Sequence, residues 1–296
     1  SMGDIVSTPN GKHAKVLGIY PQGNKDIYQI TFSDGRSTEC CEDHLWEVYY
    51  PDNWGQKPKV LSLKEIIEKS QTLRRKFQVR LPEHEEIIDA NLPIDPYVLG
   101  CLLGDGEMTV MGRIGFSSAD KCIIDKLNDS VEGIFKYKKD SSYDYIYTHG
   151  NKGSGYKKGK FDSELRQHIY DLGLFGKKSH EKFIPDQYLY DTSKSQKIQL
   201  LQGLLDTDGY TTQQSNSLYF YSSSEVLSQQ VQYLVRSIGG TAKLSTRQKN
   251  YTYKNQHKAG RPSFTITIDY KQKANVVSLD RKKVCLKDNG QYIKNK

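Results

Sequence analysis

Short runs of alternating apolar and polar side chains fill the first fifty residues, with glycine-containing turns between them. The segments "GKHAKVLGIY" and "DIYQITFSDGRSTEC" show this alternation, which predicts strands because successive strand side chains point to opposite faces. Turns are expected at Pro9-Asn10-Gly11, Gln22-Gly23-Asn24 and Asp34-Gly35. A polar connector with a helical pattern follows at 62–77. The sequence therefore predicts a small all-β module joined by a linker to the rest of the chain.

Beyond residue 92 one pattern of elements occurs twice. The apolar runs "VLGCLLGDGEM" (98–108) and "LLQGLLDTDGY" (200–210) predict helices that end near 105 and 208. Asp95 and Pro96 suit the first helix start as N-cap and first helical residue. A strand, an amphipathic helix and further strands follow each run, and "FSSAD" (116–120) and "YSSSE" (221–225) fall at matching places. We expect two copies of a small α+β domain about a pseudo-twofold axis.

Both predicted helices end in an aspartate followed by a glycine. Gly106 and Gly209 suit the left-handed position after a helix, and an ordinary helix end would account for them. An aspartate at a helix C-terminus, however, is disfavoured by roughly 0.3–1 kcal/mol. Two such helices side by side would also bring the Asp105 and Asp208 carboxylates together. A divalent cation between them reverses both effects, and oxygen ligands suit Mg²⁺.

The two helices also share a glycine at the same height. Aligning Asp105 with Asp208 aligns Gly100 with Gly203, and small residues at matching positions let two helix backbones touch. We therefore predict that Gly100 and Gly203 form the interface between the helices.

The composition indicates a polyanionic partner. The chain of 296 residues has 43 Lys plus Arg, a net charge of +8 and 21 tyrosines, which favours nucleic acid over a membrane. No apolar run approaches the ~20 residues that span a bilayer. Five scattered cysteines argue against a disulfide framework and for a reducing, cytoplasmic location. Magnesium at paired carboxylates in a basic protein indicates phosphodiester chemistry.

The two acid-ended runs, each followed by a strand and a second helix, resemble the repeated motif of LAGLIDADG homing endonucleases. The resemblance covers about residues 92–285. It implies a monomer with two αββαββα repeats, at 92–190 and 191–296, whose sheets form a saddle over double-stranded DNA. A linker at 61–91 precedes them. By this resemblance the protein makes a double-strand break in a long asymmetric target with Mg²⁺, and Ca²⁺ supports a non-cleaving complex.

The resemblance also marks individual residues. The last acid of each motif, Asp105 and Asp208, is expected to bind the metal and act in catalysis. Asp206 occupies an earlier acid position where the first copy has Leu103, so it cannot be an essential ligand in both halves. "GKKSHEKFIPDQYLY" resembles the family's lysine-x-Ile-Pro block and marks Lys182 as catalytic. The same interval of 77 residues after Asp208 reaches 285, which leaves Lys282 or Lys283 for the second half, and Lys282 is the candidate.

The expected DNA contacts lie in two basic, tyrosine-containing segments. The segment 243–262 is predicted to be an extended hairpin, and 137–160 is its counterpart in the first half; solvated loops remain the alternative for both. The candidate DNA-binding residues are Arg113, Lys138, Tyr143, Tyr145, Tyr147, Arg247, Lys249, Tyr251, Tyr253, Lys254, Lys258 and Arg261.

Residues 1–60 carry a second resemblance, to the Hint fold of a phage-type intein. His44 stands where inteins have the histidine of a Thr-x-x-His motif, with Cys41 at the threonine position. The chain starts almost at "GDIV" and ends at "YIKNK", without a leading nucleophile or a terminal His-Asn, so we expect that it cannot splice. Two alternatives stay open: a catalytically silent, maturase-like DNA- or RNA-binding relative, and a remnant of a protein-splicing intein.

Overall fold

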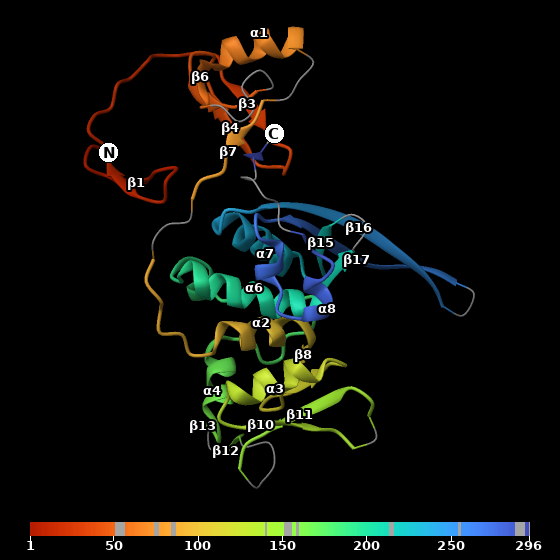
Figure 1. Ribbon diagram of the computed structural model, residues 1–296. Helices are drawn as coiled ribbons and strands as arrows, with labels where there is room; N and C mark the ends of the chain where they lie inside the picture. Colours follow the sequence, from red (N-terminus) through yellow and green to blue (C-terminus); the bar gives the residue numbers. More distant parts are fainter. Residues whose placement is uncertain are drawn as a thin grey trace.

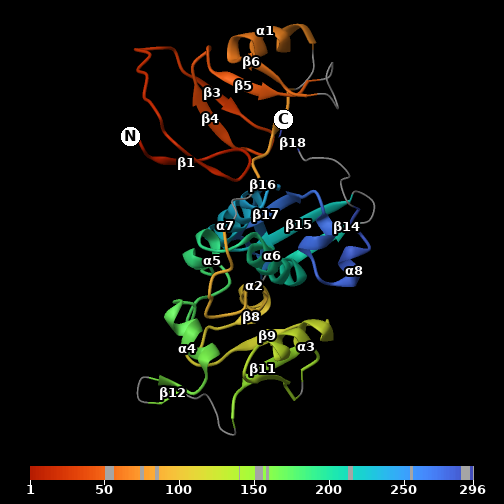
Figure 2. The same ribbon diagram turned by 60° about the vertical axis from the view of Figure 1, so that its left-hand side comes forward.

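Two similar α+β halves lie below a small amino-terminal module in the view of Figure 1, and Figure 2 shows the same arrangement from the side. The computed structural model describes residues 1–50, 57–73, 77–83, 87–139, 141–150, 156–157, 160–212, 216–253, 256–287 and 294–295. Within these residues no helix is long and apolar enough to cross a membrane.

Each half contains the predicted order of helix, two strands, helix, two strands and helix, and the first half has an additional pair of short strands, Tyr156–Lys157 and Lys160–Phe161, before its last two helices. The first half consists of α2 (Pro96–Asp105), β8 (Gly106–Glu107), β9 (Gly115–Ser117), α3 (Lys121–Asp129), β10 (Ile134–Tyr137), β11 (Asp144–Thr148), β12 (Tyr156–Lys157), β13 (Lys160–Phe161), α4 (Glu164–Asp171) and α5 (Asp186–Tyr190). The second half consists of α6 (Lys194–Asp208), β14 (Gly209–Thr212), β15 (Ser217–Ser222), α7 (Glu225–Ser237), β16 (Thr241–Tyr253), β17 (Gln256–Asp269), the 3-10 helix η2 (Lys273–Val276) and α8 (Asp280–Lys283).

The two halves have sheets of the same topology. Their strand orders are β8-β9-β11-β10 and β14-β15-β17-β16, and all neighbours are antiparallel. Gly106 pairs with Phe116 as Gly209 pairs with Phe220, so Phe116 and Phe220 are equivalent. Asp120 and Ser224 are then the equivalent N-caps of α3 and α7. The predicted match of "FSSAD" with "YSSSE" is therefore wrong by one residue; "FSSAD" is equivalent to "FYSSS".

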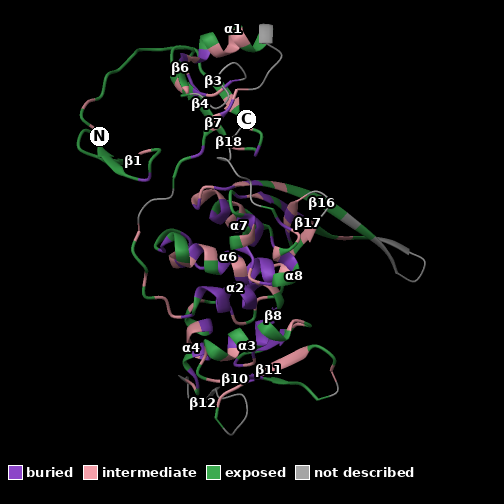
Figure 3. Cartoon of the chain, viewed as in Figure 1, coloured by how far each residue is buried: buried purple, intermediate pink, exposed green. Residues whose placement is uncertain are grey.

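Helices α2 and α6 pack against each other between the two sheets, where burial is greatest (Figure 3). A Cβ atom on Gly100 would lie 2.3 Å from the Leu200 carbonyl oxygen, and one on Gly203 would lie 2.3 Å from the Tyr97 carbonyl oxygen. Because no real Cβ atom approaches an oxygen this closely, the contact requires glycine on both helices. The predicted interface of Gly100 and Gly203 is present, and buried leucines of both helices surround it.

The helix ends differ from the prediction in one respect. Asp95 caps α2 through its side chain, which accepts from the Val98 amide, and Pro96 follows as predicted. Gly106 and Gly209, however, are extended, with φ of −75° and −86°, so the predicted left-handed conformation is wrong. Each is the first residue of a strand that turns back over the helix end. A Cβ atom would lie 2.4 Å from the Leu102 oxygen at Gly106, which is why glycine is needed there.

The amino-terminal module consists of short hairpins around a small core. Its strands are β1 (Ile5–Ser7), β2 (His13–Lys15), β3 (Tyr28–Thr31), β4 (Ser37–Cys40), β5 (Leu45–Val48) and β6 (Lys59–Ser62), and α1 (Leu63–Leu73) and β7 (Val79–Arg80) follow. They pair as β1-β2, β3-β4 and β5-β6. The turns predicted at Pro9-Asn10-Gly11 and Asp34-Gly35 join β1-β2 and β3-β4, whereas Gln22-Gly23-Asn24 lies between two strands that do not pair with each other, and the third pair, β5-β6, was not predicted. Strand β18 (Lys294–Asn295) pairs with β7, so segments before and after the two halves meet.

Candidate active site and nucleic-acid interface

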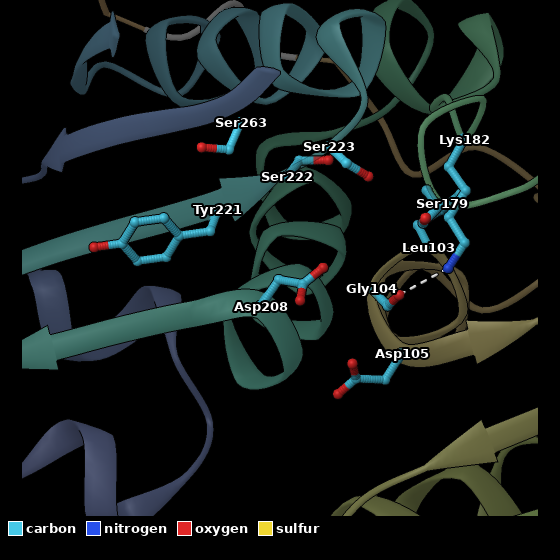
Figure 4. A pocket seen from close by; sticks show the side chains of 10 residues that line it. All are labelled: Leu103, Gly104, Asp105, Ser179, Lys182, Asp208, Tyr221, Ser222, Ser223 and Ser263. Carbon is cyan, nitrogen blue, oxygen red and sulfur yellow. Dashed lines mark hydrogen bonds between the residues drawn. The ribbon is translucent and has the colours of Figure 1, made fainter. Parts of the chain in front are cut away.

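The tips of α2 and α6 converge on an open cavity. Asp105 is the last residue of α2 and Asp208 the last of α6, and both line a cavity of about 420 Å³ together with Lys182 (Figure 4). The remaining lining residues are Leu103, Gly104, Ser179, Tyr221, Ser222, Ser223 and Ser263. The structure thus brings together the two predicted acids and one predicted lysine, although they are up to 103 residues apart in sequence.

The protein environment makes the charged form of both acids unfavourable. Burial, together with the negative charge of Asp105, raises the pKa of Asp208 to about 6. Burial also raises the pKa of Asp105, against the opposing charges of Lys182 and Lys282. Two carboxylates that repel each other in a partly dry site favour a bound cation.

The donor set suits a hard divalent cation. No group of three or more His, Cys, Asp or Glu side chains gathers as a metal site in the described part of the chain. Two carboxylates on an open cavity leave coordination positions for water and for substrate oxygens, as Mg²⁺ and Mn²⁺ prefer. The residues present therefore fit such an ion, and Asp105 and Asp208 are the side chains that could hold it.

Lys182 holds the tip of α2. Its buried Nζ donates to the carbonyl oxygens of Leu102 at 3.2 Å, Gly104 at 2.7 Å and Gly106 at 2.8 Å. Burial lowers the pKa of Lys182 to about 8, although the charges of Asp208 and Asp105 oppose this shift. A lysine at these carbonyls satisfies groups that a helix end leaves without partners and offsets the helix dipole.

Lys282 does the same for α6. Its Nζ donates to the carbonyl oxygens of Leu205 at 2.6 Å, Asp206 at 2.8 Å and Gly209 at 2.7 Å, and burial lowers its pKa to about 8. Lys283 instead points to Asp280 at the surface, 3.7 Å away. Of the two lysines left open by the sequence, Lys282 is thus the structural equivalent of Lys182.

Asp206, the additional acid of the second motif, forms structural hydrogen bonds away from the cavity. Asp206 is 1% exposed and accepts hydrogen bonds from the Ser278 amide at 2.9 Å and the Tyr97 hydroxyl at 3.0 Å. It joins α2 to the segment that precedes Lys282. Asp206 does not line the cavity with Asp105 and Asp208, which agrees with the expectation that it is not a ligand common to both halves.

The second sheet turns a polar, aromatic face away from its helix. Its buried side chains, such as Phe220 and Ile266, face α7. The opposite side, here called the second open face, consists by strand register of Tyr210, Tyr219, Tyr221, Lys243, Ser245, Arg247, Ser263, Thr265 and Thr267. The predicted contact Arg247 belongs to this face and is exposed.

The equivalent side of the first sheet carries different residues. The first open face consists of Glu107, Gly115, Ser117, Lys136, Asp144 and Ile146. Tyr145 and Tyr147 point the other way, into the core, because they share a face with buried Phe116 and Phe135. The predicted DNA contact at Tyr147 is therefore wrong, whereas Tyr145 is half-buried against the core and its contact stays a prediction. Tyr147 is 1% exposed, and its hydroxyl donates to Glu132 at 2.9 Å.

The other candidate contacts fall into two groups. Lys138, Tyr143 and Arg261 are exposed, and Arg113 lies 3.8 Å from Glu107. Lys254 and the side chains of Lys249, Tyr251, Tyr253 and Lys258 lie outside the described residues.

Four polar residues of α3 and α7 bind the segments that contain Lys182 and Lys282, and the sequence did not predict them. They are Asp120, Lys126, Ser224 and Gln230, whose partners are Arg281, Ser278, Lys182 and Ile184. The available signal was their equal spacing of six residues in the two repeats, which becomes visible only with the repeat alignment corrected.

Fold and site together define a two-repeat α+β protein with paired helix-end carboxylates. Residues 195–284 match the family described as LAGLIDADG-like domain. This match covers the second repeat. The chain is also 25% identical over 269 residues to the replicative DNA helicase DnaB of Synechocystis sp.. It spans 28% of the length of that curated relative.

Solved structures of a homing endonuclease are among the matches. Mesophilic variants of I-DmoI match 62% of this chain and 86% of theirs, with 12% identity and a TM-score of 0.37. I-DmoI in complex with DNA and Mn matches 60% of this chain and 89% of its own, with 14% identity and a TM-score of 0.32.

Proposed function

We propose that the chain is a LAGLIDADG-type homing endonuclease that makes a site-specific, metal-dependent double-strand break in DNA. One observation carries this proposal: two helices in backbone contact at Gly100 and Gly203 present Asp105 and Asp208 to one open cavity. Burial raises the pKa of both carboxyl groups, so the chain by itself makes their charged forms unfavourable. A divalent cation and a phosphodiester would relieve their repulsion, which gives the arrangement a function.

In this proposal Asp105 and Asp208 hold Mg²⁺ at the phosphodiester, and Ca²⁺ gives a bound but uncut complex. When bound, the ion polarises the phosphate and favours ionisation of a water molecule. Lys182 and Lys282 fix the tips that carry the acids, and their charges oppose the rise of the acids' pKa values. The open cavity leaves room for the phosphate between the helix tips.

The open faces would bind the duplex on either side of the cavity. Lys243 and Arg247 on the second open face, and Lys136 on the first, supply positive charge for phosphate contacts. Because the two faces share a lysine at one equivalent position, Lys136 and Lys243, but differ at Glu107, Gly115 and Ser117 against Tyr210, Tyr219 and Tyr221, we propose that the monomer reads a long asymmetric target. The net charge of +8 predicts binding that weakens steeply with salt.

A cleavage selection tests the proposal. The purified chain would be incubated with Mg²⁺ and a plasmid library that carries randomised duplex segments, and linearised plasmids would be sequenced. We expect cutting at one related set of sites, which EDTA abolishes and Ca²⁺ does not support. Binding to selected duplexes without cutting in Mg²⁺ or Mn²⁺ would instead favour the catalytically silent, maturase-like alternative. Absence of DNA binding would refute both.

We further propose that residues 1–60 are a Hint-like remnant of an intein that carried this nuclease within the host cytoplasm. Pairing of β7 with β18 supports this, because it joins segments from both sides of the two repeats. Contact of the Arg236 side chain with the Asp34 carbonyl oxygen, at 2.7 Å, also ties the module to α7. Fusion of the chain between two reporter domains tests the idea: a ligated reporter product would show an active splicing element instead.

A further inference from the structure

The segment that carries each capping lysine is held by the opposite repeat. Lys182 and Ile184 belong to the first repeat, yet their backbone is bound by α7 of the second. The Ser224 hydroxyl donates to the Lys182 carbonyl oxygen at 2.7 Å. The Gln230 side chain accepts from the Ile184 amide at 2.7 Å and donates to its carbonyl at 2.8 Å. The second repeat thus fixes the lysine that caps the first repeat's acid-bearing helix.

The reverse contact is formed by α3. Arg281, next to Lys282, donates to both carboxylate oxygens of Asp120, at 3.0 and 2.7 Å. Lys126 Nζ donates to the Ser278 hydroxyl at 2.6 Å. The first repeat therefore fixes the segment whose lysine caps the second repeat's acid-bearing helix.

The two contacts use equivalent positions. Asp120 and Ser224 are the N-caps of α3 and α7, and Lys126 and Gln230 each lie six residues further on. The chemistry differs: the Arg281–Asp120 contact is ionic, whereas Ser224 and Gln230 bind through neutral groups. Equivalent positions with unlike side chains indicate that the exchange of support is a property of the two-repeat arrangement.

We propose that each repeat positions the capping lysine of the other, so that each strand break depends on side chains of both repeats. This inference rests on the proposed nuclease function. Asp120, Lys126, Ser224 and Gln230 are positioning residues, since they act through Lys182 and Lys282. Loss of one contact makes the segment that contains Lys182 or Lys282 more mobile, and the helix end that this lysine caps then also becomes more mobile. A change in α7 therefore impairs the Asp105 tip, and a change in α3 impairs the Asp208 tip.

Strand-resolved cleavage tests the proposal. Each strand of a selected duplex would carry its own end label, and the cutting rate of each strand would be measured in wild type, Gln230→Ala and Asp120→Arg. We expect each variant to slow one strand by about 10- to 100-fold, the size typical of a lost outer-shell partner. The two variants should slow opposite strands and accumulate nicks of opposite polarity.

Rescue and matched controls separate positioning from general damage. Asp120→Arg combined with Arg281→Asp restores the ion pair with its ends exchanged and should return the slowed strand to within about threefold of wild type. Gln229→Ala and Asp125→Arg change exposed residues of the same helices and should leave both strands unaffected. If Gln230→Ala fails to fold, Gln230→Glu takes its place, because it keeps the acceptor for the Ile184 amide and loses the donor to the Ile184 carbonyl.

Equal slowing of both strands, slowing of the same strand by both variants, or no slowing would each overturn the proposal. Amide hydrogen exchange gives a readout that needs no cleavage. Gln230→Ala should speed exchange at the amides of 182–184 and not at those of 278–282, and Asp120→Arg should do the reverse. A wild-type chain that cuts no DNA would refute the proposed function, whereas unchanged exchange at both segments would refute the mutual support.

Discussion

The two repeats share a backbone plan but present different surfaces to the cavity they enclose. Beside Asp208 the second open face carries Tyr210, Tyr219 and Tyr221, whose rings lie in sequence at centroid distances of 6.4 and 6.2 Å. The equivalent positions beside Asp105 are Glu107, Gly115 and Ser117 by strand register. One half offers aromatic contact area, and the other offers a carboxylate and small side chains.

The repeats also differ in reach. Strands β16 and β17 have 13 and 14 residues, whereas β10 and β11 have 4 and 5. At about 3.3 Å per residue the second hairpin extends several times as far as the first (Figure 1). The two halves share the helix seam, the terminal acids, the capping lysines and one lysine on each open face, Lys136 and Lys243. The features shared at the helix tips therefore mark the proposed chemistry, and the aromatic side chains and the long hairpin of the second half mark recognition.

The largest expected effect comes from the acids that both halves share. Asp105→Asn and Asp208→Asn remove a charge that a cation needs while keeping size and shape. Each should lower double-strand cleavage by at least about 100-fold and leave DNA affinity within a few-fold. Cleavage and filter-binding assays on the same duplex check this. An asymmetric outcome, with one acid dispensable, would break the equivalence of the two tips.

The next largest effect should come from the contact between α2 and α6, and substitutions at Gly100 and Gly104 should differ in their consequences. Gly100→Ala pushes a methyl group against the Leu200 backbone, which cannot move aside, so the free energy of unfolding should fall by about 1–3 kcal/mol. At Gly104 the obstacle is the Thr207 side chain, whose hydroxyl oxygen lies 2.0 Å from the place that an added Cβ atom would take. The Thr207 Cβ atom also lies 2.6 Å from that place, so thermal unfolding should show that Thr207→Gly, compared with the Thr207→Gly single variant, rescues Gly104→Ala but not Gly100→Ala. Rescue of both would mean that the backbones are not in contact.

Local sequence patterns were sufficient to predict the elements that these variants probe. Asp95, Pro96 and the apolar runs fixed the two helices, and the repeated glycines predicted their contact. The faces of β11 could not be predicted, because Tyr143, Tyr145 and Tyr147 alternate with Asp144, Ile146 and Thr148, and either set could face a core. The support of Lys182 by Ser224 spans 42 residues and depends on how the repeats dock, which no local pattern encodes.

The pH dependence of cleavage should show which acid is the more strongly perturbed. Asp208 has a pKa of about 6, well above its usual value, so it takes up a proton as the pH falls through 6 and then competes with the cation. At limiting Mg²⁺ the cleavage rate should fall about tenfold per pH unit below that point. More Mg²⁺ should move the midpoint to lower pH. If the midpoint of the cleavage rate against pH did not change with Mg²⁺ concentration, the titrating group would be one other than Asp208.

The smallest effects should come from the recognition surfaces. Arg247→Ala should weaken DNA binding about 5- to 10-fold and lower the slope of log affinity against log salt by about one, as expected for one lost phosphate contact. Tyr219→Ala should weaken binding to a similar extent with the slope unchanged, since no charge is lost. Binding titrations at several salt concentrations separate the two.

In the first half Glu107→Gln should tighten binding about twofold. The change removes a carboxylate from the first open face, and the positive charge of nearby Arg113 is then no longer offset by Glu107. If Glu107→Gln weakened binding as much as Arg247→Ala, the first open face would depend on its carboxylate to orient Arg113, and the two repeats would be more alike in recognition than their side chains indicate.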